Sequence, residues 1–281
     1  MRWRPGDRGS IEDLRGRRGI GGAAPLGIGG LLLVAALSYF TGIDFTSIVG
    51  NLPVAPTEET SGELVTTPEE ERMVDFVGAV ASDAQETWVR LLGPRYERTV
   101  VTLFRDAVQS ACGAAESATG PFYCPGDRKV YLDLGFFAEL SQRFGAPGDF
   151  AQAYVIAHEF GHHVQNLLGT SARVQQDPRP GADSASVALE LQADCYAGVW
   201  GHDASQPGRL AAGRVELEPG DAEEALQAAA AIGDDRLQRM GGGRVAPERF
   251  THGSSAQRME WFRRGMETGD PAQCDTFGGR R

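Results

Sequence analysis

The pentapeptide HEFGH at residues 158–162 carries the residue types and the spacing that metal chemistry needs. His158 and His162 are four residues apart, so on a helix with about 100° per residue both rings lie on one face and can bind one cation. Glu159 follows the first ring, where its carboxylate can take a proton from water. A bound Zn²⁺ lowers the pKa of water to about 7. The motif therefore predicts hydrolysis assisted by a single zinc ion, with Glu159 as general base.

The residues around this motif predict a buried helix. Apolar side chains recur near the helical period from Phe150 to Leu168, with Asp149 as the expected N-cap and Gly169 as the stop. Two histidines and a glutamate buried there without partners would cost several kcal/mol, and a metal ion supplies the partner. His163 points about 140° away from the face of the motif, so we interpret it as a packing or hydrogen-bonding residue.

A zinc hydrolase needs a third protein ligand and an open fourth position. The metzincin pattern is excluded, because Gln165 and Leu168 stand where it requires Gly and His. A second helix is predicted at residues 184–200, where Glu190 and Asp194 share one face in an apolar background. We assign Glu190 as the third ligand and Asp194 as the acceptor for the outer nitrogen of a ligating histidine. Spacing alone leaves the reverse assignment open.

Longer motifs resemble a known family. HEFGHHVQ followed by ELQADCYAGVW is similar to the bacterial neutral zinc metallopeptidases, a membrane-anchored family within the gluzincin group. The resemblance includes the opening MRW, the EDLRG near residue 12, and segments at 120–137, 231–238, 250–265 and 274–277. It implies a zincin-like fold, peptidase activity, and a glutamate ligand with an aspartate one turn later.

A Thr-His segment at residues 251–252 has a counterpart in related membrane metallopeptidases, after the zinc site. That similarity implies that His252 donates a hydrogen bond to the oxyanion formed on the substrate carbonyl. The alternative is a helix-capping or surface histidine, just before a helix that Ser254 or Ser255 can cap. Arg258 is a weaker candidate for the same oxyanion, because arginine on an amphipathic helix is more often a surface charge. His202 is interpreted as a loop residue at a helix end.

The fold class predicted from these patterns is α+β. We expect a mainly helical zincin-like domain with a small antiparallel sheet, preceded by one N-terminal transmembrane helix. Residues 129–134 alternate and follow a turn signal, and residues 98–104 predict a neighbouring strand. In gluzincins an edge strand crosses the active-site helix and pairs with the peptide, so 129–134 is expected in that role or as an ordinary interior strand.

The N-terminal quarter predicts a membrane anchor. Residues 19–43 carry no charge and are long enough to cross a bilayer, with a cleavable signal as the alternative. Residues 1–18 hold six Arg against three acidic residues and predict a cytoplasmic tail. Residues 44–67 predict a flexible linker, and 68–281 the peptidase domain. The expected location is the cytoplasmic membrane, in a single pass with the N-terminus inside and the domain outside.

Cysteine usage agrees with an extracytoplasmic domain. The four cysteines are an even number, and Cys112 with Cys124 brackets a turn-like loop that a disulfide would close. Cys195 with Cys274 would then be the second pair, although the sequence leaves the connectivity open. A small buried thiol is the alternative for Cys195.

Composition and motifs argue against two other functions, nucleic-acid binding and hydrolysis by a serine nucleophile. With 38 acidic and 27 basic residues and a single lysine, the chain lacks the clustered cations of a nucleic-acid-binding surface. No Gly-x-Ser-x-Gly elbow supports a serine nucleophile. The expected partners are a peptide or protein substrate and the lipid bilayer. Two alternatives remain: a non-catalytic envelope protein with a structural metal site, and an amide hydrolase acting on cell-wall peptides.

Overall fold

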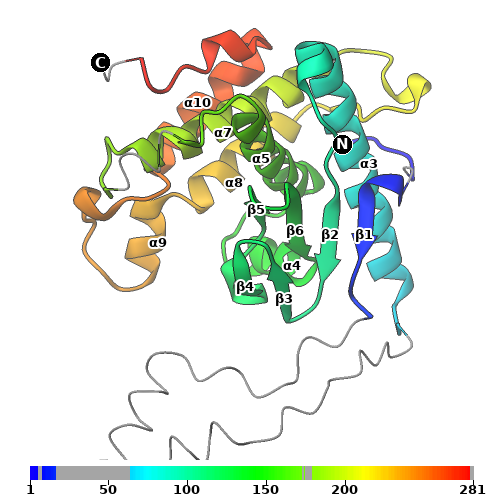
Figure 1. The fold of residues 1–281 in the computed structure, drawn as a ribbon, viewed down its shortest axis with the longest axis horizontal. Helices are drawn as coiled ribbons and strands as arrows, with labels where there is room; N and C mark the ends of the chain where they lie inside the picture. Colours follow the sequence, from blue (N-terminus) through cyan, green and yellow to red (C-terminus); the bar gives the residue numbers. More distant parts are fainter. Residues whose placement is uncertain (6–7, 17–63, 173, 175–178, 279–281) are drawn as a thin grey trace, which may run out of the picture. The chain divides into compact units, whose positions relative to one another are not determined.

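Helices carry most of the chain between residues 68 and 268 (Figure 1). The structure is a computed structural model and describes residues 1–5, 8–16, 64–172, 174 and 179–278. The helices are α3 (Pro68–Leu92), α4 (Gly135–Gln142), α5 (Asp149–Leu167), α7 (Ala185–Ala204), α8 (Asp221–Ala231), α9 (Asp234–Met240) and α10 (Ser255–Thr268). Side-chain oxygens cap three of them, namely Thr67 on α3, Ser184 on α7 and Ser254 on α10.

The N-terminus of α5 differs from the prediction by one position. Gly148 is the N-cap, and Asp149, the expected cap, is the first residue of the helix. An acidic residue in the first turn still favours the helix, because its charge opposes the positive end of the helix dipole. The helix that carries the HEFGH motif therefore begins within one residue of the prediction. Its N-cap residue makes no side-chain hydrogen bond, and Asp149 acts through its charge in the first turn.

The strands form a mixed four-stranded sheet and a separate hairpin. The sheet has the order β1-β2-β6-β5, in which β1, β2 and β6 are mutually parallel and only β5 runs antiparallel. The predicted small antiparallel sheet is therefore wrong for the pairing of β1, β2 and β6, and it holds for the β5–β6 pair and the β3–β4 hairpin. The bounds are β1 Ile11–Asp13, β2 Val101–Phe104, β3 Ala107–Ser110, β4 Gly113–Glu116, β5 Phe122–Cys124 and β6 Lys129–Asp133.

The two faces of the sheet pack against different partners. Val101 and Leu103 of β2 belong to the main core, together with apolar residues of α3 and α5. On the opposite face, Phe104 and Tyr131 pack with residues of the hairpin region. All four residues of β2 are buried, because both faces of the strand are covered.

The strand predicted to bind substrate lies inside the sheet. β6 has β2 on one side and β5 on the other, so its backbone is already paired. The edge-strand prediction for residues 129–134 is wrong, and the alternative of an interior strand is confirmed. β5 is the strand at the edge, and it contacts α5. Sequence alternation identifies a strand but not its place in a sheet, which long-range pairing decides.

The first fourteen residues belong to the domain. β1 pairs with β2, with Ile11 opposite Val101, and Glu12 accepts hydrogen bonds from Thr102 Oγ1 and Lys129 Nζ, both at 2.7 Å. Residues 1–14 form one compact unit with residues 66–281. Residues 1–14 therefore pack with the domain and supply a strand to its sheet.

The predicted anchor at residues 19–43 and nearly all of the predicted linker lie outside the described residues. Within the part of the chain that the structure describes, no helix combines the length and the apolar composition needed to cross a bilayer.

Both expected disulfides are present. Cys112–Cys124 joins the β3–β4 turn to the end of β5, and Cys195–Cys274 joins α7 to the C-terminal segment. Cys195 and Cys274 are fully buried, whereas Cys112 is exposed. The first bridge thus secures the edge strand, and the second secures the tail against α7.

Helices α7 and α10 cross in backbone contact. A Cβ atom added at Gly198 would lie 2.1 Å from the carbonyl oxygen of Phe262, and one at Gly265 would lie 2.0 Å from that of Cys195. Such distances are impossible, so only glycine permits this crossing. Because α10 also carries Arg258, the crossing sets the depth at which that residue enters the domain.

We predict that Gly265→Ala lowers the free energy of unfolding by about 1–3 kcal/mol, because the new methyl group must push α10 away from α7. Urea denaturation followed by circular dichroism measures this change. Gly241→Ala is the matched control, since Gly241 has φ −73° and an added Cβ would meet no atom closer than 3.6 Å. An equal loss of stability in both variants would contradict the explanation.

Candidate metal centre

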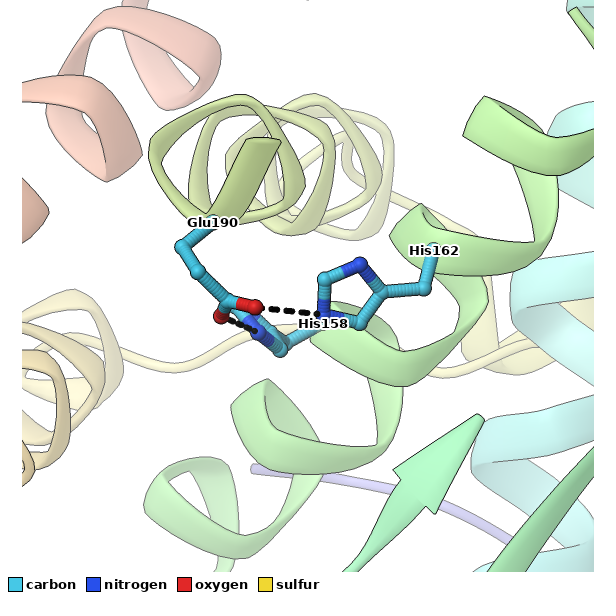
Figure 2. Close-up of side chains that lie close together, drawn as sticks. All are labelled: His158, His162 and Glu190. Carbon is cyan, nitrogen blue, oxygen red and sulfur yellow. Dashed lines mark hydrogen bonds and ion pairs between the residues drawn. The ribbon is translucent and has the colours of Figure 1, made fainter. Parts of the chain in front are cut away.

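Helices α5 and α7 bring three potential ligands to one point (Figure 2). His158 Nε2 lies 3.2 Å from Glu190 Oε2, and His162 Nε2 lies 3.5 Å from Glu190 Oε1. The rings stand nearly perpendicular, with centroids 4.7 Å apart. The carboxylate of Glu190 therefore points between the two rings and presents one oxygen to each.

These separations suit a tetrahedral zinc site. Ligand atoms about 2.0–2.1 Å from one Zn²⁺ at tetrahedral angles lie roughly 3.3 Å from one another. The nitrogen-to-oxygen distances of 3.2 and 3.5 Å bracket that value. Two imidazoles and one carboxylate are also a donor set that zinc accepts readily. Three protein donors leave the fourth tetrahedral position for water or substrate.

A second group of carboxylates has different chemistry. Asp149, Asp221 and Glu224 approach one another at the N-termini of α5 and α8. Asp149 and Asp221 pair with the amino group of Met1, at 3.2 and 3.1 Å. This group has no ring nitrogen and already holds a cation, so we do not assign it a metal.

Burial and charge oppose each other at the HEFGH histidines. Burial alone would lower the pKa of His158, but the carboxylates of Asp194 and Glu190 outweigh it and raise that pKa to about 10. Burial would likewise raise the pKa of Glu190, yet His162 and His158 hold it well below its usual value. The protein groups by themselves thus form a largely buried cluster with an ionised carboxylate directed at the two rings.

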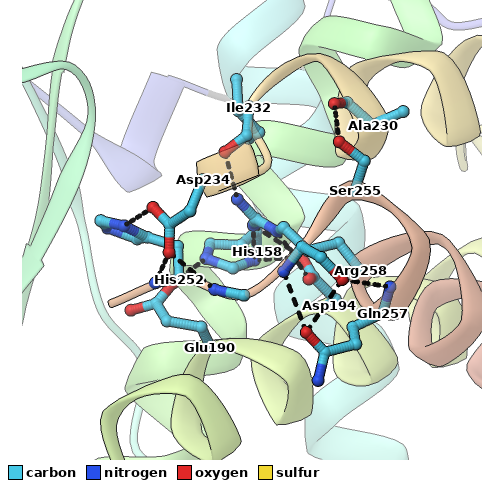
Figure 3. Close-up of polar contacts among 12 residues, drawn as sticks. His158, Glu190, Asp194, Ala230, Ile232, Asp234, His252, Ser255, Gln257 and Arg258 are labelled. Atoms are coloured by element: carbon cyan, nitrogen blue, oxygen red, sulfur yellow. Dashed lines mark hydrogen bonds and ion pairs between the residues drawn. The ribbon is translucent and has the colours of Figure 1, made fainter. Parts of the chain in front are cut away.

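Asp194 lies behind His158 and not at the convergence point (Figure 3). Its Oδ1 is 2.8 Å from His158 Nδ1, so the ring donates there and keeps Nε2 free to face Glu190. Tyr154 donates its hydroxyl to the same oxygen, and Arg258 donates to both oxygens at 2.8 and 2.9 Å. Although burial acts to raise the pKa of Asp194, Arg258 and His158 lower it to about 2.

Arg258 is placed differently from the surface charge that we expected. Its side chain is 2 % exposed, and its guanidinium forms a bidentate pair with Asp194. A sequence signal for this position exists, because Arg258, Phe262 and Gly265 are spaced as one helix face and are the buried residues of α10. Arg258 thus holds the carboxylate that contacts His158.

Glu159 lies at the wall of a cavity of about 660 Å³. Its side chain is buried, and within the described residues we find no hydrogen bond or ion pair that engages its carboxylate. Phe122 and Tyr123 of β5 line the same cavity. The edge strand of the sheet, β5, therefore faces the metal-ligand cluster. The carboxylate is therefore available to a reactant that enters the cavity.

His252 also lines the cavity, on a loop that Asp234 organises (Figure 3). Asp234 Oδ2 accepts the backbone N–H groups of Thr251, His252 and Gly253, at 2.7, 2.7 and 3.0 Å. The hydrogen bond with Asp234, together with the charge of Glu190, raises the pKa of His252 against the effect of burial. Ser254, and not His252, caps α10. The imidazole of His252 is therefore free of a capping role and lies half-exposed at the cavity.

The other two histidines lie apart from the cluster. His163 is fully buried and bonds to the Tyr123 hydroxyl and the carbonyl oxygen of Glu97, in agreement with the packing interpretation. His202 is in the last turn of α7, where its Nδ1 contacts the carbonyl oxygen of Met266. It is helical and not in a loop.

A close helix contact allows Glu190 to reach the rings. A Cβ atom at Gly161 would lie 3.0 Å from both Cα and the carbonyl oxygen of Ala193. Gly161 occupies the turn between His158 and His162, and Ala193 the turn after Glu190. The absence of a side chain at Gly161 thus lets α7 approach α5 at the height of the cluster.

A helix that carries the histidine pair and a second helix that supplies a carboxylate thus form a candidate metal centre in an α+β domain. The comparisons identify the family: the model described as "Putative neutral zinc metallopeptidase" matches residues 1–277, and the chain belongs to this family. The uncharacterized protein YpfJ of Escherichia coli K12 is 44% identical over 295 residues, covering 99% of both chains.

A mycobacterial relative matches a shorter region. The uncharacterized protein Rv2575 of Mycobacterium tuberculosis H37Rv is 50% identical over 205 residues, which cover 72% of this chain and 69% of its own length. The uncharacterized protein Mb2605 of Mycobacterium bovis matches to the same extent. No solved structure matches the chain significantly.

We predict that chelator-treated protein loses stability as the pH rises from about 6.5 to about 10. The folded pKa of His158 lies above its unfolded value of about 6.5, so its contribution is complete below pH 6.5 and disappears through about 10. Urea denaturation between pH 6 and pH 10 measures the decline. His158→Gln should flatten it, whereas an unchanged stability of the wild-type protein across this range would contradict the prediction.

Proposed function

We propose that the domain is a zinc-dependent peptidase that hydrolyses peptide bonds, with Glu159 as general base. The observation that carries this proposal is the convergence of His158, His162 and Glu190 at zinc-like separations beside an unpaired Glu159. A structural zinc site closes its fourth position with a protein ligand and needs no free carboxylate beside it. The cavity of about 660 Å³ is large enough for several residues of a peptide.

The residues of the chain divide the chemistry between them. When bound, zinc supplies a Lewis acid that polarises the substrate carbonyl and lowers the pKa of water. Glu159 takes the proton of the attacking water and then passes it to the leaving amine. His252, with its pKa raised, donates to the developing oxyanion. Asp194 and Arg258 take no part in proton transfer, because they are occupied with each other and with His158.

We further propose that the substrate backbone pairs with β5. This strand is the edge of the sheet on the side of α5, and Phe122 and Tyr123 line the cavity. An extended peptide added there would form main-chain hydrogen bonds and lie across the HEFGH helix. The disulfide Cys112–Cys124 would keep the strand in place for this pairing.

We predict that Glu159→Gln lowers peptide hydrolysis by at least about 100-fold while zinc content stays near one ion per chain. The amide keeps the size of the side chain but cannot accept the proton, and general-base catalysis is worth about 10²–10⁴. Cleavage of a broad peptide library, followed by mass spectrometry, gives the rate, and elemental analysis gives the zinc content.

Glu139→Gln is the matched control, because Glu139 lines the same cavity but is exposed and has no step in the proposed mechanism.

His252→Ala should retain zinc and lower kcat by about 10²–10³. Full activity in Glu159→Gln would overturn the peptidase proposal. A zinc-bound wild-type protein that cleaves neither peptides nor cell-wall amides would point to the non-catalytic envelope protein.

We propose that the domain works outside the cytoplasm, attached to the membrane by the apolar residues 19–43. Two disulfides support an oxidising compartment. Because residues 1–14 and 66–281 form one unit, both ends of the intervening segment start from the same domain. The proposal therefore puts residues 1–14 on the same side of the membrane as the domain, in place of a cytoplasmic N-terminus.

We predict that a membrane-impermeant maleimide added to intact cells labels both Arg4→Cys and Arg98→Cys variants to the same extent. Both positions are exposed, one before the apolar segment and one after it. Labelling after lysis provides the control for total protein. Labelling of Arg98→Cys alone in intact cells would restore the single-pass topology with the N-terminus inside.

A further inference from the structure

His162 is held from behind by a neutral amide. Its Nδ1 lies 2.9 Å from Gln165 Oε1, one turn further along α5. Gln165 is fully buried and does not reach the cavity. We propose that Gln165 is a positioning residue that holds His162 as the Nδ1–H tautomer, through a chain of hydrogen bonds that ends on the carbonyl oxygen of Cys274.

The direction of every bond in this chain follows from its last member. A carbonyl oxygen only accepts, so Gln192 must direct its Nε2 to Cys274, at 2.9 Å. Gln192 Oε1 then faces Gln165 Nε2, at 3.2 Å, and Gln165 Nε2 also donates to the carbonyl oxygen of Leu189, at 2.6 Å. Gln165 Oε1 is consequently the atom that faces His162 Nδ1, which must donate.

This order fixes what the outer edge of His162 can do. With the proton on Nδ1, the lone pair of Nε2 is left to face Glu190, 3.5 Å from its Oε1. The buried relay also restrains rotation of the ring, because both glutamine amides are held at each end. The disulfide Cys195–Cys274 anchors the last acceptor to α7, which is the helix that carries Glu190.

His158 and His162 therefore have hydrogen-bond acceptors of different charge. His158 donates to the ionised Asp194, whereas His162 donates to an uncharged amide. A second buried carboxylate behind His162 would add negative charge to a cluster that already holds Glu190 and Asp194. The amide orients the ring without that charge. The inference rests on the proposed zinc site, and the experiment below separates the two.

The first measurement is zinc affinity by competition with a chromophoric chelator. Gln165→Met keeps a side chain of similar size but removes the oxygen that accepts from His162. Zinc binding should therefore weaken by about 10–100-fold. Gln192→Met should weaken it less, because the carbonyl oxygen of Leu189 still orients Gln165. The double variant should bind zinc as Gln165→Met does, since both changes break one relay.

Gln85→Met is the control for the loss of a buried glutamine. Gln85 is 1 % exposed on α3 and bonds to Ser10 and Thr99, away from the cluster. It should lower the thermal midpoint and leave zinc affinity unchanged. Wild-type zinc affinity in a folded Gln165→Met protein would overturn the proposal. Where Gln165→Met does not fold, Gln192→Met carries the same test.

The second measurement reads the tautomer itself. Long-range ¹H–¹⁵N spectra of the wild-type protein should show the ring proton of His162 on Nδ1, with or without zinc, at a pH where the ring is neutral. A proton on Nε2 in the metal-free protein would overturn the relay, whatever the metal does. A wild-type protein that keeps the Nδ1–H tautomer and binds no zinc would overturn the zinc proposal and leave the relay intact.

Discussion

The contact of α5 with α7 over Gly161 is the constraint on which the site depends. Glu190 reaches between the rings of His158 and His162 only because the helix backbones meet at Ala193, three residues further along α7. The same principle recurs at Gly198 and Gly265, where α7 meets α10. Helix α7 is therefore held closely on two sides, and its position is determined by missing side chains as much as by apolar burial.

A row of alternating charge runs through the contact region. Arg258, Asp194, His158 and Glu190 follow one another at hydrogen-bond distance, all buried or nearly so. Each charge in such a row is stabilised by its neighbours, and removal of one leaves an uncompensated charge that costs several kcal/mol. The arrangement explains why a mainly apolar core tolerates these groups, and why helix α10, which has no ligand of its own, is still part of the site.

Local patterns predicted the parts of the structure that local forces determine. The helices around HEFGH and Glu190, a serine cap on α10 and the disulfide that closes the loop between Cys112 and Cys124 follow from spacing and composition. The mixed sheet, the interior place of β6 and the burial of Arg258 were not predicted, because each depends on contacts between distant segments. β1 has only three residues, too few for a periodic signal, and its neighbour β2 lies far along the chain.

The position of β1 also bears on how the domain assembles. β2 has one neighbour, β6, close in sequence, and receives the other from residues that precede the long segment 15–65. Parallel pairing over such a separation loses a large loop-closure entropy before the strand contacts form. This entropy loss slows folding. Until β1 docks, the backbone of β2 remains open to foreign strands. A newly made chain would therefore pass through an aggregation-prone stage that chaperones of its compartment could protect.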